Sequence, residues 1–139
     1  MHQSKIISVL LLAAGVSTAI PAIAEGETDW NCRNTSYEIS CDETGCEASD
    51  AHTPMDIYLG DNTMEVCAYT GCWSGRPTYQ QRGGRFEVWT GHNLPFSTNT
   101  DWTANISITV DTETAVATVL VGNLYATPAT CETHQASVD

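Results

Sequence analysis

Basic side chains are scarce in this sequence. Its 139 residues include only five lysines and arginines against 17 acidic residues, which gives a net charge of −12. The single lysine is Lys5, and the arginines are Arg33, Arg76, Arg82 and Arg85. Nucleic acids and anionic lipid surfaces are therefore poor partners, because like charges oppose their approach. A basic protein would be attracted instead, although the acidity could equally serve only to keep an exported chain in solution.

The chain also lacks an apolar run long enough to cross a membrane. The run at residues 6–14 has about the length of the apolar core of a signal peptide. Pro21 follows, and residues 22–24, Ala-Ile-Ala, place small residues where a cleavage site needs them. We expect residues 1–24 to be a signal peptide and the mature chain to be periplasmic or secreted, without a membrane span. The mature chain keeps four arginines and all 17 acidic residues, so its net charge would be −13.

Arrangements that are typical of catalysis are missing as well. The histidines beyond the signal peptide, His52, His92 and His134, have no serine or cysteine partner in a recognisable pattern. In residues 71–75, GCWSG, the serine comes one position too late for the G-x-S-x-G turn of hydrolases. We therefore expect a binding protein rather than an enzyme, with no catalytic residue, no metal and no cofactor.

Cysteine, by contrast, is well represented. All six cysteines lie in the mature part, and an even number in a small exported domain indicates three disulfides. Two segments, CDETGC at 41–46 and CAYTGC at 67–72, share the template Cys-x-x-Thr-Gly-Cys. Glycine can supply the positive φ of a tight hairpin, and such a hairpin sets its two cysteines opposite each other at bonding distance. The predicted disulfides are Cys41–Cys46, Cys67–Cys72 and, by elimination, Cys32–Cys131. Zinc binding or redox chemistry is the alternative, but the spacers are longer than usual for either.

Alternation of apolar and polar residues with a period of two predicts β-strands and no long helix. The clearest signal is a hairpin of β-branched residues over 105–121, with its turn at 111–114. Other strands are expected at 37–41, 55–59, 64–69 and 85–90. We predict one all-β domain at residues 25–131, an antiparallel barrel or sandwich of seven or eight short strands, followed by a flexible tail at residues 132–139.

Residues 73–89, WSGRPTYQQRGGRFEVW, contain three of the four arginines, interleaved with aromatic residues. Its glycines and proline indicate exposed loops, and arginine and aromatic side chains often carry the binding energy of an interface. The predicted binding residues are Trp73, Ser74, Arg76, Tyr79, Arg82, Arg85 and Trp89. The alternative is that the arginines pair locally with acidic residues while the aromatic side chains fill the core.

A second charged segment contains Asp42, Glu43, Glu47 and Asp50 within nine residues. Its spacing does not match a calcium-binding EF-hand loop. A solvated acidic hairpin is therefore favoured over a loose calcium site.

Ser74, Gly75 and Tyr79, followed by the aromatic strand 86–89 and Gly91, resemble the periplasmic lysozyme inhibitors of the MliC/PliC type. These are small exported β-barrels whose Ser-Gly-x-x-Tyr loop enters the lysozyme cleft. The resemblance implies inhibition of a basic cell-wall hydrolase such as c-type lysozyme, with Ser74, Arg76 and Tyr79 reaching the partner. It also places the stretch 37–42 and Cys131 at the position of that family's disulfide. The loop is one residue longer here, and the basic residue that the family has before its glycine is absent.

Two other assignments remain open. The overall layout looks equally like small exported bacterial β-proteins of no known function. A carbohydrate- or envelope-binding module is the alternative function, in which Trp73, Tyr79, Trp89 and Trp102 would form stacking platforms.

Overall fold

The structure, a computed structural model, describes residues 28–122 and 124–134. The predicted signal peptide and the last five residues of the predicted tail lie outside these ranges. All of the regular secondary structure in the described residues is β-strand. In this part of the chain no helix is long and apolar enough to span a membrane.

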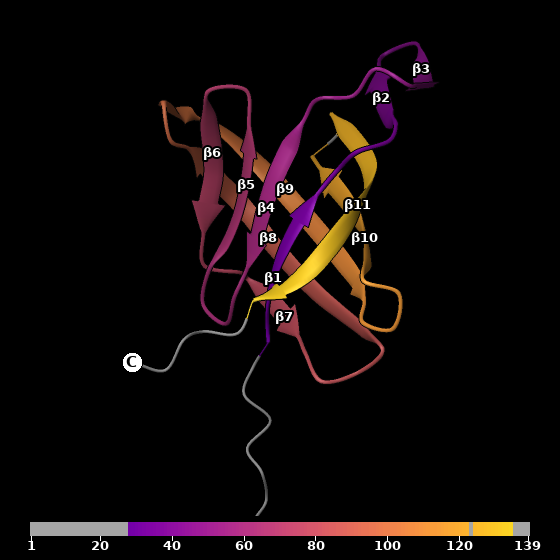
Figure 1. Cartoon of the computed structure of the whole chain (residues 1–139). Helices are drawn as coiled ribbons and strands as arrows, with labels where there is room; N and C mark the ends of the chain where they lie inside the picture. The colour runs from indigo at the N-terminus through magenta and orange to yellow at the C-terminus, as the bar shows by residue number, and fades with distance from the viewer. Residues whose placement is uncertain (1–27, 123, 135–139) are drawn as a thin grey trace, which may run out of the picture.

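Eight antiparallel strands close into a barrel, which confirms the predicted all-β class and decides between barrel and sandwich (Figure 1). Around the barrel they are β1 (Asp29–Arg33), β4 (Met55–Leu59), β5 (Met64–Ala68), β6 (Gly71–Gly75), β8 (Phe86–Phe96), β9 (Asn99–Asp111), β10 (Val116–Val121) and β11 (Tyr125–His134). Pairing of β1 with β11 joins the first strand to the last and closes the barrel.

The eight barrel strands agree with the seven or eight predicted, and three further strands bring the sheet to 11. β2 (Glu38–Asp42) and β3 (Gly45–Ser49) form a hairpin that projects from one end of the barrel (Figure 1). The short β7 (Tyr79–Gln81) pairs with β8 alone and lies toward the opposite end.

The barrel interior is filled by the alternate residues that the sequence pattern singled out. Ile106, Ile108 and Val110 of β9 are buried against Val119 and Val121 of β10, with Ile106 opposite Val121 in the register. The predicted hairpin is therefore confirmed, and its period-two pattern records one face turned to the core and one to solvent.

All three predicted disulfides are present, and each joins residues that lie directly opposite each other on paired strands. Cys32–Cys131 connects β1 to β11, so it lies across the closure of the barrel. Cys131 therefore pairs with Cys32, and Cys41 pairs locally with Cys46. This corrects the disulfide position that the resemblance to lysozyme inhibitors implied for residues 37–42.

The two Cys-x-x-Thr-Gly-Cys segments both form hairpins, but their glycines serve different purposes. Gly45 has a φ of 149°, as predicted. In the second hairpin the positive φ belongs to Tyr69, at 58°. Gly71 is required for space instead, because a Cβ there would lie 2.8 Å from the Phe96 ring and from the Ser97 hydroxyl. The prediction that glycine conformation explains both copies is therefore correct for the first copy only.

The last strand continues beyond the boundary predicted for the domain. Thr133 pairs with Trp30 and His134 with Asp29, so residues 132–134 belong to β11 rather than to a flexible tail. The alternation of the strand is weak after Cys131 because all three of these side chains are exposed. Sequence pattern alone therefore placed the end of the domain three residues too early.

Candidate binding surface

The segment with the arginine and aromatic residues begins where the barrel wall is irregular. β6 pairs with β8 only at Trp73 and Phe96, whereas further along β8 the Thr78 N–H donates to the Thr90 carbonyl at 2.7 Å. Residues 74–77 therefore lie opposite residues 91–95 of β8. No regular ladder joins these two stretches, and β8 has a bulge between Gly91 and Leu94.

The Leu94 side chain fills the space at this irregularity. A Cβ at Gly75 would lie 2.9 Å from Leu94, and a Cβ at Gly91 would lie 2.6 Å from Leu94 and 2.8 Å from the Met64 sulfur. Both glycines are therefore required by a close approach of Leu94 to the backbone. Gly75, one of the glycines predicted to mark an exposed loop, is therefore a packing residue.

Ser74, Arg76 and Tyr79 reach the surface along this irregular stretch. Ser74 is half-buried, Arg76 is exposed, and the side chain of Tyr79 is 54% exposed. The Tyr79 hydroxyl donates to the Gln81 side chain at 3.0 Å. The loop is anchored at Thr78, whose N–H and hydroxyl both donate to the Thr90 carbonyl, at 2.7 and 2.9 Å. The loop therefore exposes polar and aromatic side chains while its C-terminal end is held to β8 at Thr78.

His92 and Asn93 occupy the β8 bulge opposite the loop, and both are exposed. Asn93 has a φ of 52°, and its N–H donates a hydrogen bond to the Asn105 side-chain oxygen at 2.9 Å. Bulges commonly redirect side chains next to functional sites. We call Ser74, Arg76, Tyr79, His92 and Asn93 the β6–β7 surface. The sequence predicted a strand that ends at residue 90, so it gave no signal that residues 92 and 93 lie opposite this loop.

Arg76 differs from the other arginines in its charge environment. Arg33 donates to Asp56 at 2.7 Å, Arg82 pairs with Asp61, and Arg85 pairs with Asp111 at 3.2 Å and with Glu113 at 3.4 Å. Within the residues that the structure describes, Arg76 makes no ion pair. Its guanidinium is therefore the one that a partner can approach without displacing a carboxylate of the described chain.

Trp73 and Trp89, both predicted to bind a partner, are core residues. Their side chains are 0% exposed. Trp73 packs against Phe96 with ring centroids 4.8 Å apart, and the Trp89 indole N–H donates to the Gly60 carbonyl at 3.1 Å. Neither indole reaches the surface, so the alternative expectation, that the aromatic residues of this segment fill the core, is correct for these two.

Arg82 is also structural. Its side chain is only 12% exposed, pairs with Asp61, donates to the Thr28 carbonyl and lies over the Trp89 ring at 5.6 Å. Close by, the buried carboxylate of Glu87 accepts a hydrogen bond from the Trp30 indole at 2.9 Å and one from the Gly83 N–H at 3.0 Å. These groups form a polar plug inside the barrel, at the end away from the β2–β3 hairpin.

Arg85 is exposed but already engaged. It spans Asp111 and Glu113 at the β9–β10 turn and lies over the Phe86 ring at 5.2 Å. Burial raises the pKa of Asp111, but hydrogen bonds from Arg85 and from the Glu113 N–H outweigh burial, so the pKa lies below its ordinary value. A partner would have to compete with these carboxylates for Arg85.

The four side chains predicted as sugar-stacking platforms do not form one surface. Trp73 and Trp89 are buried, which leaves Tyr79 and Trp102. Tyr79 pairs with Thr90 of β8. Trp102 is next to Thr103, which pairs with Pro95 of β8, and the Trp102 and Phe96 ring centroids are 4.5 Å apart. Five or six residues of strand separate them, about 15–20 Å. No continuous aromatic platform results.

The cysteine pair of the second hairpin is the one place in the described chain where three potential metal-binding side chains converge, Glu65, Cys67 and Cys72. Both sulfurs are bonded to each other and have no thiolate to offer. The acidic side chains of the β2–β3 hairpin do not converge in this way in the described residues.

Comparison with the models of known protein families found no match, and comparisons with curated proteins and with solved structures found none either.

Proposed function

We propose that this is an exported, non-enzymatic binding protein that inhibits a basic cell-wall hydrolase such as a c-type lysozyme through the β6–β7 surface. The observation that carries the proposal is the exposed Arg76, which makes no ion pair with the described residues, between Ser74 and Tyr79 on a closed, disulfide-bonded barrel. The resemblance of this loop to that of the MliC/PliC-type inhibitors motivates the choice of partner.

The charge distribution supports a basic enzyme with an acidic cleft. A mature chain of net charge −13 attracts a basic protein over the range of a Debye length, about 8 Å at physiological salt. Most glycoside hydrolases carry two carboxyl groups in the catalytic cleft. Among the arginines, Arg76 is the one without an ion pair in the described part of the chain, so the acidic surface would steer the encounter while this arginine enters the cleft.

The barrel supports the proposal by holding the loop in shape before the partner arrives. Thr78 is anchored to β8, and the Cys67–Cys72 disulfide fixes the hairpin from which β6 starts. A loop that is already ordered loses little conformational entropy on binding, which favours affinity. Disulfides form and persist in oxidising compartments, in agreement with a periplasmic or secreted location.

Binding of a c-type lysozyme to the oxidised domain, measured by calorimetry near physiological salt, tests this proposal. Arg76→Ala should weaken binding at least tenfold, because arginine and tyrosine at the centre of an interface are frequent hot spots. Tyr79→Ala should have a similar effect. The matched control is Arg33→Ala, which removes the same charge from an exposed arginine that already pairs with Asp56. Equal loss from Arg33→Ala and Arg76→Ala would reduce the interaction to net charge and contradict the proposal.

A further inference from the structure

The β2–β3 hairpin has an open strand edge. β3 pairs with β2 over five residue pairs and, in the described part of the chain, with no other strand. All five of its residues are exposed, and Figure 1 shows the hairpin projecting from the barrel, at the end away from β7. β3 is therefore an edge strand of five residues that can accept another strand of similar length, whereas the free edge of β7, which pairs with β8 alone, is only three residues long.

The register identifies the backbone groups that face outward. Cys41 and Cys46 lie opposite each other with Cα atoms 4.0 Å apart, the short separation of a non-hydrogen-bonded pair. The bonds between β2 and β3 therefore fall on the neighbouring pairs, which include Glu47. It follows that the N–H and C=O groups of Cys46 and Ala48 point away from β2 and are free for a further strand.

The hairpin is fixed in this conformation. Besides the disulfide, one side-chain oxygen of Asp42 accepts hydrogen bonds from the Thr44 N–H at 2.7 Å, the Thr44 hydroxyl at 2.6 Å and the Gly45 N–H at 3.2 Å. At its base, the Glu38 carboxylate accepts a hydrogen bond from the Thr53 N–H at 2.9 Å. A partner strand would thus meet a preformed edge and pay little to order it.

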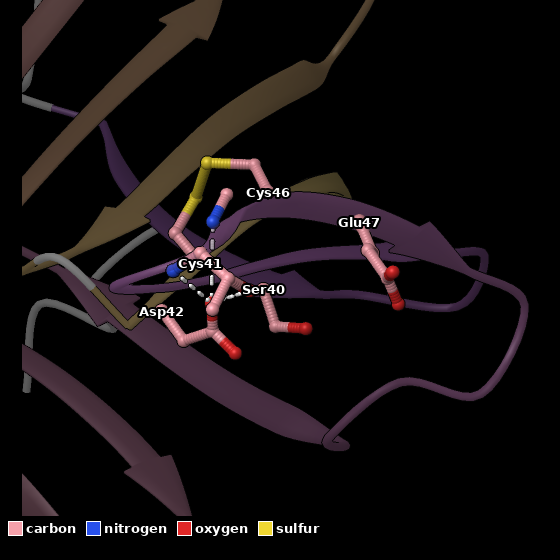
Figure 2. Close-up of a pocket in the computed structure, with 7 residues that line it drawn as sticks. Ser40, Cys41, Asp42, Cys46 and Glu47 are labelled. Atoms are coloured by element: carbon pink, nitrogen blue, oxygen red, sulfur yellow. Dashed lines mark hydrogen bonds between the residues drawn. A yellow bond between two sulfur atoms is a disulfide. The ribbon is translucent and has the colours of Figure 1, made fainter.

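The chemistry of the two faces selects the partner. Figure 2 shows the Cys41–Cys46 disulfide on one face of the hairpin and Ser40, Asp42 and Glu47 on the other. Residues 38–50 contain five acidic side chains and no basic one. A second copy of this hairpin would set like charges against each other, which disfavours self-pairing. A strand with basic side chains on the Glu47 face and small apolar side chains on the disulfide face would be complementary.

We propose that the free edge of β3 binds an extended basic segment of a partner protein as an additional β-strand. Main-chain hydrogen bonds to Cys46 and Ala48 would supply affinity, and the pairing of basic side chains with Glu47 and Asp42 would supply selectivity. This site is separate from the β6–β7 surface, so it does not depend on the inhibitor proposal.

Amide hydrogen exchange of the isotope-labelled, oxidised domain tests the site. The probe is a capped seven-residue peptide of alternating lysine and valine, at physiological salt. Exchange at the Cys46 and Ala48 amides should slow at least tenfold at saturating peptide, while Glu47, already bonded to β2, should change less. The control peptide replaces each valine with proline, which keeps the charge but removes the backbone donors.

Substitutions at one position separate backbone pairing from charge. Ala48→Pro removes an N–H that faces outward, without touching the bonds to β2, and should weaken peptide binding at least tenfold. Ala48→Val keeps the N–H and should bind as the parent does. Because the exchange measurement uses the unsubstituted domain, the proposal stays testable even if the proline variant does not fold.

Three results would overturn the inference. Equal binding of the proline peptide would show that charge alone is responsible. Protection at residues 74–79 instead of β3 would move the site to the β6–β7 surface. A dimer that forms without peptide and is abolished by Ala48→Pro would identify a second copy as the occupant.

Discussion

Removal of the Cys32–Cys131 disulfide should destabilise the domain more than removal of either other disulfide. The bond joins β1 to β11 at the closure of the barrel and spans 99 residues of sequence, whereas each of the other two spans 5. Both cysteines are buried, so alanine is the substitution that avoids placing a hydroxyl in the core. The test variant is therefore the double substitution Cys32→Ala, Cys131→Ala.

The expected magnitudes follow from loop closure in the unfolded chain. A disulfide that closes a loop of about 100 residues stabilises the folded state by about 4.7 kcal/mol, and one that closes about six residues by about 2 kcal/mol. A domain of this size is typically stable by about 5–15 kcal/mol in total. Loss of the long bridge should therefore remove a large share of the stability, and loss of either short bridge a minor one.

The two short bridges provide a matched pair of controls. Cys41–Cys46 and Cys67–Cys72 have the same separation and the same flanking Thr-Gly, but the first lies on the exposed hairpin and the second is half-buried in the barrel wall. Loop closure predicts the same loss in the free energy of unfolding for the two alanine double variants. Because Cys67–Cys72 is half-buried, its removal should cost a further fraction of a kcal/mol.

Urea denaturation followed by tryptophan fluorescence provides the free energies of unfolding by linear extrapolation. Trp30, Trp73 and Trp89 are buried, so their emission reports on the core. Mass spectrometry of each variant should show that the two remaining disulfides are intact. If the long-bridge variant lost no more stability than the short-bridge variants, loop closure would not explain how these bonds act in this protein.

Other predictions concern packing and ionisation. Gly71→Ala should cost about 1–3 kcal/mol of stability in urea denaturation, because the new Cβ would collide with the Phe96 ring, and an unchanged midpoint would contradict the packing assigned to this glycine. Burial and a hydrogen bond with the Tyr69 hydroxyl raise the pKa of Tyr125 to about 12, so the stability that this tyrosine contributes is present below pH 10 and lost as the pH rises towards 12. An ultraviolet titration should show a late-ionising tyrosine whose pKa falls in Tyr69→Phe, whereas Tyr58, whose pKa is also raised by its hydrogen bond to Asp29, should be unaffected by that substitution. Glu87→Ala should cost about 2–3 kcal/mol, because it leaves buried donors without an acceptor, and a loss under about 0.5 kcal/mol would show that the polar plug is not structural.

Local chemistry was enough to predict much of the fold. Residues 105–121 formed a hairpin because β-branched residues alternate with polar ones around a turn, and the cysteine pairing followed from hairpin geometry. The choice between barrel and sandwich was open, because it depends on the pairing of β1 with β11, which lie about a hundred residues apart. Nothing in either strand alone specifies that contact.

The candidate site was harder to predict for a related reason. In residues 73–89 aromatic side chains occur both in the core and on the surface, and whether each one is buried depends on how its strand is placed in the barrel. Trp73 and Trp89 point inward by strand parity, whereas Tyr79 points outward. The position of His92 and Asn93 opposite the loop depends on the bulge in β8, which has no clear sequence signal.

The central functional claim is tested most directly by titrating the activity of a c-type lysozyme with the oxidised domain, residues 25–139, near physiological salt. Weak screening would let any polyanion bind lysozyme, so the salt concentration matters. The account predicts stoichiometric inhibition that Arg76→Ala weakens and Arg33→Ala does not. Full lysozyme activity at a tenfold excess of the domain would contradict it.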